Sequence, residues 1–159
     1  MQLWTEENKD DSQALMLLAQ FYMAEDRLGE AKVTYETLNS IAGDNPVVLN
    51  NLAWLLGDTN PEQGIKYAIK ALSLNSNSPF TQDTIAMLYM KSKQYNKALP
   101  YATNAAIELP KNAEVQFNYA SVLAANNQVA KAKEWLNDML KKATTDESKQ
   151  LIEDQLEQL

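Results

Sequence analysis

The sequence predicts an all-α fold: a right-handed α-solenoid of about four antiparallel helix pairs, closed by a C-terminal capping helix. Two observations lead to this prediction. The chain of 159 residues is rich in Ala, Leu, Lys, Gln, Glu and Asn and has only 4 Gly and 5 Pro, a composition that favours helices. Small residues also recur every 33 or 34 positions, and a period of this length is typical of stacked helical repeats.

Two interleaved series of small residues define the repeat. The first lies in the middle of each odd-numbered predicted helix and consists of Ala19, Ala53, Ala86 and Ala120. The second lies near the start of each even-numbered helix and consists of Ala31, Gly64, Ala98 and Ala132. Antiparallel helices approach to about 8–10 Å where small side chains face each other. Large residues beside each of these positions therefore fill the space around the helix contact.

Eight helices are expected in the four repeats, and a ninth follows them. The eight predicted ranges are 12–25, 29–41, 46–57, 61–74, 79–91, 95–108, 113–125 and 129–142. Pro61 suits the first turn of its helix, because its missing N–H costs nothing there. Thr144 to Glu147 resembles a helix cap and leads into the ninth helix, from Ser148 to about Gln158. The apolar stripe of this last helix would cover the end of the solenoid.

We predict a single domain over residues 1–159, organised by the repeat. The repeats are expected at 12–45, 46–78, 79–112 and 113–145, followed by the capping helix at 146–159. Residues 1–11 match the end of a second helix from a preceding repeat, with Trp4 at its buried position. We therefore expect the chain to be a piece of a longer protein, and a short natural N-terminal extension is the alternative.

Composition and charge exclude several function classes. A net charge of −7 and a pI of about 4.6 oppose nucleic-acid binding, which needs a cationic surface. The chain has no cysteine and no histidine, so it lacks thiol chemistry and the commonest general base. No stretch approaches the roughly 18–20 apolar residues of a membrane-spanning helix. We expect no metal, no cofactor and no direct membrane insertion by this segment.

The first helix of each pair lines the concave face of a stacked array, and this face is the candidate binding groove. We expect it to hold a protein or peptide partner. The predicted contact residues are Met16, Gln20, Met23, Asn50, Asn51, Trp54, Phe80, Asp83, Met87, Phe117 and Asn118. Methionines accept varied apolar partners, and amides can bond an extended peptide backbone. Core packing is the alternative for the methionines and Trp54, and local capping or solvation is the alternative for Asn51 and Asn118.

The repeated residues resemble the tetratricopeptide family over about residues 12–145. In each copy a large residue precedes a large-small pair and an aromatic or leucine, and small residues open the second helix. The run Asn45 to Leu55 (NPVVLNNLAWL), the segment Pro79 to Met90 and the closing Trp135-Leu136 resemble the C-terminal repeats of bacterial tetratricopeptide proteins. Among these are the lipoproteins of PEP-CTERM/exopolysaccharide systems. That resemblance implies a scaffold for export or protein sorting in the periplasm or envelope; without it, a cytoplasmic location is expected.

Two sharper functions are not supported by the residues. Chaperone-binding tetratricopeptide domains grip a C-terminal carboxylate with Lys, Arg and Asn, and the resemblance places Met16, Gln20, Asn51, Phe80 and Thr84 at those positions. Only Asn51 fits. No nucleotide-binding loop, GxSxG or HExxH motif is present, so we expect no enzyme activity. A self-associating homo-oligomeric array and a helper domain of a larger enzyme are the alternatives to the groove.

Overall fold

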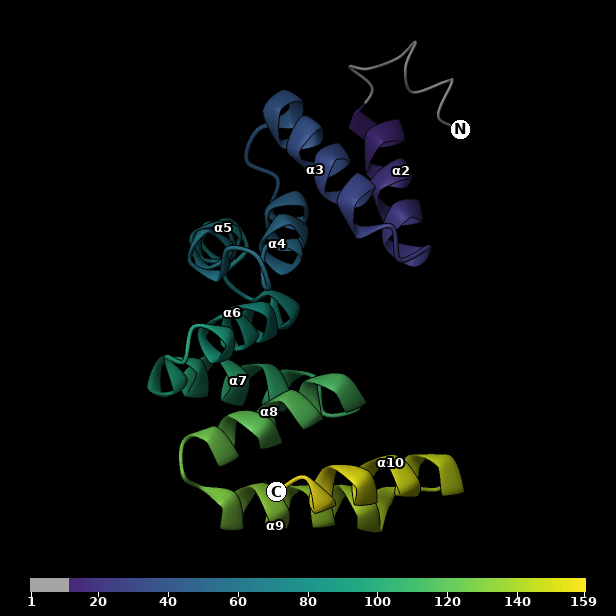
Figure 1. Cartoon of the computed structure of the whole chain (residues 1–159), viewed down its shortest axis with the longest axis vertical. Helices are drawn as coiled ribbons and strands as arrows, with labels where there is room; N and C mark the ends of the chain where they lie inside the picture. Colours follow the sequence, from purple (N-terminus) through teal and green to yellow (C-terminus); the bar gives the residue numbers. More distant parts are fainter. Residues whose placement is uncertain (1–11) are drawn as a thin grey trace. The chain divides into compact units, whose positions relative to one another are not determined.

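Residues 12–159 are described by the computed structural model, and they form nine α-helices and no strand (Figure 1). The helices are α2 (Ser12–Ala24), α3 (Leu28–Ala42), α4 (Pro46–Leu55), α5 (Pro61–Leu74), α6 (Pro79–Lys91), α7 (Tyr95–Glu108), α8 (Ala113–Ala125), α9 (Val129–Lys142) and α10 (Asp146–Glu157). The predicted all-α class is therefore confirmed. The expected remnant of a preceding repeat at 1–11, with Trp4, lies outside the described residues.

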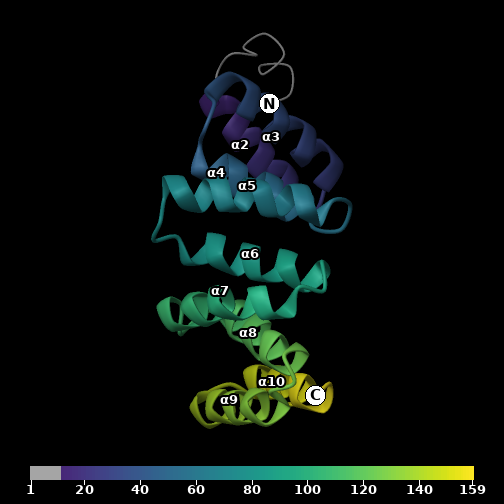
Figure 2. The ribbon, with the colours of Figure 1, turned by 90° about the vertical axis from the view of Figure 1, so that its left-hand side faces the viewer.

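The chain divides into two compact units, and the boundary falls inside α6. One unit ends at Thr81, and the other runs from Gln82 to Leu159. In the first unit α2 packs against α3 and α4 against α5, and Figure 2 shows α4 and α5 side by side. In the second, α8 packs against α7 and α9, and α10 packs against α9. The predicted single domain and its repeat boundaries remain predictions.

Side-chain caps fix where several helices begin. The Asn45 carboxamide accepts hydrogen bonds from the backbone N–H groups of Val47 and Val48 at the start of α4. Asn60 caps α5 and Asn112 caps α8 in the same way. Such caps satisfy N–H groups that have no partner within the helix. They set the first turn, and through it the rotation that decides which side chains face the core.

Two predicted helix ends were wrong by about two residues. The third helix ends at Leu55 rather than at 57, because the backbone N–H of Asn60 bonds to Leu56 and closes a turn. The last helix begins at Asp146 rather than at Ser148. Its cap is Thr145, whose hydroxyl accepts from the Ser148 N–H, and this places Asp146 already in the first turn.

The turn inside most repeats has a common geometry. Asp26, Lys93 and Asn127 adopt positive φ angles of 55°, 56° and 59° just after α2, α6 and α8. In each case the next residue donates back to the helix, as in the bond from the Gln128 N–H to the Leu123 carbonyl at 2.9 Å. This is the left-handed helix ending known as the Schellman motif. The turn after α4 differs, because it runs for five residues, from Leu56 to Asn60, instead of three, and none of them has a positive φ.

The core of each unit forms where helix pairs meet. In the first unit Leu15, Tyr35, Leu38, Val48 and Leu52 form one buried cluster from α2, α3 and α4. In the second unit the buried face of α7 consists of four alanines, which are Ala98, Ala102, Ala105 and Ala106. Aromatic residues from the neighbouring helices pack around this face.

Candidate functional site

Helix α4 presents a face of amide, aliphatic and aromatic side chains in the first unit. Val47, Asn50, Asn51 and Trp54 follow one another at intervals of three, one and three residues, so they share one side of the helix. The other side, which includes Leu52, is buried in the core. Trp54 remains 49% exposed. Its indole is therefore accessible to a partner rather than enclosed by packing.

Asn51 is tied to the core of the first unit. Its Nδ2 donates a hydrogen bond of 2.9 Å to the hydroxyl of Tyr35, whose ring is buried. Burial raises the pKa of the Tyr35 hydroxyl, and the bond from Asn51 opposes that rise. The bond also means that Asn51 is partly engaged before any partner arrives.

Asn50 carries an acceptor that the described residues leave unused. Its Oδ1 is buried and receives no hydrogen bond from residues 12–159. A buried acceptor without a donor costs about 1–3 kcal/mol. The carboxamide lies on the same side of α4 as Trp54. The α4 face therefore combines the accessible Trp54 ring with the half-buried carboxamide of Asn50.

The other predicted contacts of the first unit divide into packed and exposed side chains. Met16 and Met23 are half-buried and pack against the core cluster of α2, α3 and α4. This agrees with core packing, the alternative to partner contact for the methionines. Gln20 is exposed on α2. Phe80, in the first turn of α6, is 56% exposed. The large accessible aromatic side chains at predicted positions of this unit are therefore Trp54 and Phe80.

In the second unit the predicted contacts include an amide bonded to a carboxylate. The Asn118 Nδ2 on α8 donates a bond of 2.9 Å to the Asp83 Oδ2 on α6. Burial raises the pKa of Asp83 to about 6, the bond from Asn118 opposes that rise, and the charge of Glu114 adds to it. Phe117 packs against the core cluster of α8, α9 and α10. Met87 is half-buried.

Two kinds of feature are absent from residues 12–159, a metal-ligand cluster and a membrane-spanning helix. Between residues 12 and 159 no group of three or more carboxylate, imidazole or thiol side chains is placed to hold a metal ion. No described helix combines the length and the apolar character needed to cross a membrane. What the predicted contacts supply is aromatic surface, amide groups and one carboxylate with a raised pKa.

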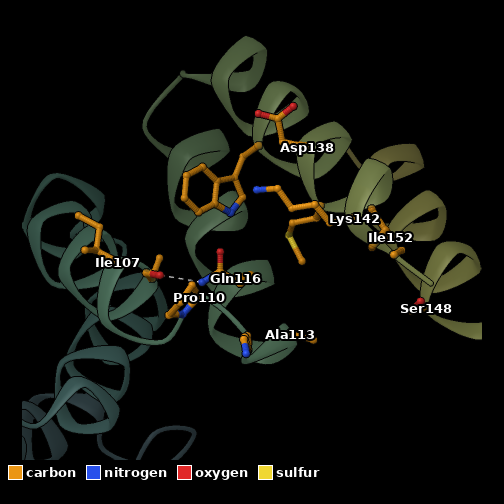
Figure 3. A pocket seen from close by; sticks show the side chains of 13 residues that line it. Ile107, Pro110, Ala113, Gln116, Asp138, Lys142, Ser148 and Ile152 are labelled. Carbon is orange, nitrogen blue, oxygen red and sulfur yellow. Dashed lines mark hydrogen bonds between the residues drawn. The ribbon is translucent and has the colours of Figure 1, made fainter. Parts of the chain in front are cut away.

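A pocket in the second unit was not predicted from the sequence. It has a volume of about 380 Å³ and is formed by α7, α8, α9, α10 and the turn between α7 and α8 (Figure 3). None of the predicted groove residues lines it. Its signal in the sequence is weak, because the lining comes from segments up to 46 residues apart, between Ala106 and Ile152. Lys142, the last residue of α9, is exposed and also lines the pocket.

Comparison with protein families finds the same repeat in both units. Residues 89–153 match a family model described as a tetratricopeptide repeat, and residues 12–45 match a second model with that description. No curated protein matches the sequence.

Several solved structures are similar to this chain. PilW, described as a widely conserved type IV pilus biogenesis factor, is 16% identical with a TM-score of 0.78, covering 91% of this chain and 68% of its own. A thermophilic TPR protein of Thermus thermophilus is 16% identical with a TM-score of 0.75, at 91% and 79% coverage. MamA from Desulfovibrio magneticus RS-1, residues 41 to the end, is 17% identical with a TM-score of 0.70, at 82% and 74% coverage. At these identities the likeness shows the fold alone, and the predicted α-solenoid is confirmed.

Proposed function

We propose, from the premise that this chain carries tetratricopeptide repeats, that it is a non-catalytic interaction module that binds an extended peptide or protein segment. The binding surface is the predicted groove along the first helices of the repeats, with its accessible aromatic positions at Trp54 and Phe80. The tetratricopeptide fold itself suggests a module of protein–protein interaction. The finer part of the proposal is that the partner binds to this groove.

The observation that carries the proposal is the exposure of two large aromatic side chains at predicted groove positions. Trp54 and Phe80 expose about half of their surface, whereas Tyr35 and Leu52 of the same unit are almost fully buried. Aromatic residues are enriched in binding interfaces and supply much of the binding free energy when a partner covers them. Their removal from water by a partner would therefore stabilise a complex.

The polar groups beside Trp54 suit an extended chain. Asn50 is half-buried on the same side of α4 as Trp54, and the backbone of an extended segment offers donors and acceptors to its carboxamide at regular intervals. Asn51 holds its place through Tyr35, so binding would not have to order that side chain. A preorganised surface loses less entropy on binding. The α4 face is therefore suited to a peptide backbone with an apolar side chain against Trp54.

Paired substitutions test the groove against another surface of the same unit. Trp54→Glu and Phe80→Glu each put a charge on the groove, and each should reduce partner capture at least tenfold, since burying an unpaired charge is costly. Val33→Glu and Ile69→Glu are the matched controls, because Val33 and Ile69 are exposed apolar residues on the second helices α3 and α5. Capture from lysate of the source organism is quantified by mass spectrometry for all four variants. Equal losses for groove and control variants, with unchanged helical circular dichroism, would sink the groove assignment.

Self-association is the competing interpretation and gives a different result in solution. An array that pairs with its own copies gains mass as its concentration rises, which light scattering after size exclusion detects. The groove proposal expects a mass near 17.9 kDa for the chain across the concentration range. A rising mass that Trp54→Glu abolishes would make the groove a self-association surface instead.

A finer proposal is that the module scaffolds export or protein sorting at the cell envelope. It is supported by the resemblance of 45–55 and 79–90 to the C-terminal repeats of bacterial tetratricopeptide proteins, among them the lipoproteins of PEP-CTERM/exopolysaccharide systems. PilW, which has a similar fold, is described as a pilus biogenesis factor. Fractionation of the source organism tests it. Envelope proteins among the partners captured through Trp54 would support this role, and partners drawn only from the cytosol would contradict it.

A further inference from the structure

We propose that the pocket beneath α10 is a second binding site, which takes an acidic peptide segment through one large apolar side chain. It lies wholly within the second unit and shares no residue with the groove predicted from the sequence. The site therefore does not depend on the groove proposal. Three features of its wall carry the assignment: an apolar interior, an unused indole N–H and two unpaired cations.

The interior of the pocket is apolar and of ligand size. Ile107, Pro110, Met139 and Ile152 are among the residues that line it, and Figure 3 shows Ile107 and Pro110 on the side opposite Ile152. Its volume of about 380 Å³ lies near the lower end of the roughly 300–1,000 Å³ typical of ligand pockets. That space accepts one large side chain together with the backbone next to it.

The wall of the pocket is held in place without a ligand. Gln116 is buried, and its Nε2 donates to the carbonyl oxygens of Ala106 at 2.8 Å and Leu109 at 3.0 Å, the first of which is drawn in Figure 3. These bonds fix the end of α7 against the start of α8. The Trp135 ring meets the edge of Tyr119 with ring centres 4.8 Å apart. A rigid wall of this kind keeps the pocket open, so a ligand has little ordering to do.

Trp135 offers a hydrogen-bond donor that the described part of the chain does not use. Its Nε1 is buried, and no acceptor between residues 12 and 159 bonds to it. Indole N–H groups usually find a partner when they are buried. A missing acceptor costs about 1–3 kcal/mol. Since Trp135 lines the pocket, a small turn of its indole toward the cavity would bring the N–H to an acceptor of the ligand, such as a peptide carbonyl, and recover that free energy.

The charges around the pocket are positive in a chain that is strongly acidic. Lys111 and Lys142 line it, and neither forms an ion pair within the described residues. The carboxylate of Asp138 is already occupied, because it accepts a 2.8 Å bond from the Lys141 ammonium group. Figure 3 shows Asp138 directed away from Gln116, whereas Lys142 extends toward the pocket. The chain as a whole carries −7, so the two free lysines form a local site for an anion.

A peptide satisfies the three features together. Its backbone carbonyl reaches the Trp135 N–H, its apolar side chain fills the interior, and neighbouring Asp or Glu side chains pair with Lys111 and Lys142. A small monocarboxylic acid would have to serve the indole and both lysines with the two oxygens of one carboxylate. The ion pairs with the two lysines supply little of the binding free energy, since exposed ion pairs contribute only about 0–1 kcal/mol each. The apolar contact therefore provides most of the affinity, and the lysines select acidic segments.

The test is a nuclear magnetic resonance titration of the full chain with a defined probe peptide, acetyl-Asp-Leu-Phe-Asp-amide. The chain has three tryptophans, so three indole N–H signals are expected, and Trp135→Phe identifies the one from Trp135. This signal should move saturably, with a dissociation constant below about 1 mM. The probe with Asn in place of both Asp residues should bind roughly tenfold more weakly, and the probe with Ala in place of Leu and Phe should not bind. No saturable movement of the Trp135 signal would overturn the proposal.

Variants with matched controls locate the site. Lys111→Gln combined with Lys142→Gln should weaken the probe about tenfold, whereas Lys131→Gln combined with Lys133→Gln, which changes the net charge equally outside the pocket, should leave affinity within about twofold. Ala113→Leu adds bulk at an exposed lining position and should abolish binding with the helical signal unchanged. Equal weakening by both lysine pairs would overturn the site.

Two further outcomes separate this proposal from others. If 3-phenylpropionate binds as tightly as the peptide, the pocket is a small-acid site and the peptide assignment is wrong. Trp54→Glu should not change probe affinity, because Trp54 lies outside the pocket. A loss with that variant would move the probe to the groove. Failure of the pocket and failure of the groove are therefore distinguishable.

Discussion

Asn51 in the first unit and Asn118 in the second occupy the same place in the repeat, two residues before Ala53 and Ala120. Both amides donate a bond of 2.9 Å, but Asn51 donates to the Tyr35 hydroxyl and Asn118 to the Asp83 carboxylate. The tyrosine partner stays neutral at ordinary pH, because the usual pKa of a tyrosine is already about 10 and burial raises the pKa of Tyr35 further. The aspartate partner titrates near pH 6. One repeat position therefore gives a pH-independent bond in one unit and a pH-dependent bond in the other.

The cores of the two units differ at another equivalent position. Tyr35, four residues after Ala31, fills the contact in the first unit, whereas Ala102, four residues after Ala98, takes that place in the second. Both side chains are almost fully buried. In the second unit the volume comes instead from residues such as Tyr89, Tyr101 and Tyr119 on α6, α7 and α8. The register of the repeat fixes where side chains meet, and it leaves open which helix supplies the bulk.

The largest expected effect is on the tyrosine of the first unit. Tyr35→Ala should cost about 3–5 kcal/mol of unfolding free energy, because it removes a buried ring and leaves a cavity. Hydrogen exchange read separately for each unit is the suitable measurement, since repeat arrays can unfold in parts. Protection should fall most in α2 to α5. Tyr35→Phe is the control, and it should cost only about 1 kcal/mol for the lost hydroxyl bond. Similar losses for both variants would show that the ring does not carry the contact.

The second expected effect is the pH dependence of the Asp83 bond. The pKa of Asp83 in the folded chain is about 6, above its ordinary value of 3.8, so between these values the folded state binds more protons than the unfolded state. Protonation of Asp83 therefore contributes most to the unfolding free energy below about pH 4, and this contribution is lost as pH rises through about 6. Asp83→Asn should remove this fall of the unfolding free energy with pH. Above pH 6 it should stabilise the chain by about 1–3 kcal/mol.

Urea unfolding of the wild type and of Asp83→Asn at pH 4, 5, 6 and 8 measures this difference directly. The difference between the two proteins isolates Asp83, because the other carboxylates are present in both. Asp138→Asn is the control. The bond from Lys141 lowers the pKa of the Asp138 carboxyl, so the contribution of Asp138 to the unfolding free energy should rise with pH, opposite to that of Asp83. A constant difference between wild type and Asp83→Asn across this range would contradict the raised pKa.

The smallest expected effect compares the two asparagines themselves. Asn51→Ala and Asn118→Ala should each cost about 1 kcal/mol. The cost of Asn51→Ala should not change between pH 5 and pH 8. The cost of Asn118→Ala should grow with pH, because the bond from Asn118 stabilises the charged form of Asp83. Thermal unfolding at the two pH values measures both, and parallel pH curves for the two variants would remove the distinction between the units.

The sequence was sufficient to predict the helices, because their local signals agree with the repeat. Asn45 before Pro46 and Asn60 before Pro61 are caps followed by proline in the first turn, and both starts were predicted correctly. Helix ends were predicted less well where a turn decides them. The end of α4 at Leu55 depends on the backbone bond from Asn60 to Leu56, which periodicity does not reveal.

The groove positions followed from the repeat, but the state of each side chain did not. Whether Met16 packs or is exposed depends on residues of α3 and α4 that lie far from it in the sequence. The partners of Asn51 and Asn118 come from 16 and 35 residues away. The pocket beneath α10 required four helices to be in place. Long-range contacts of this kind have no periodic signal in a single sequence.

The central claim is that the first helices of the repeats form the binding surface, and a hydrogen-exchange footprint of a captured partner tests it most directly. The partner is purified by capture and added back to the full chain, and exchange is compared with and without it. We expect protection to increase in α4 and α8, around Trp54 and Asn118, while α5 and the exposed face of α9 stay unchanged. Protection confined to α3, α5 or α9, with no change in α4, would contradict the claim.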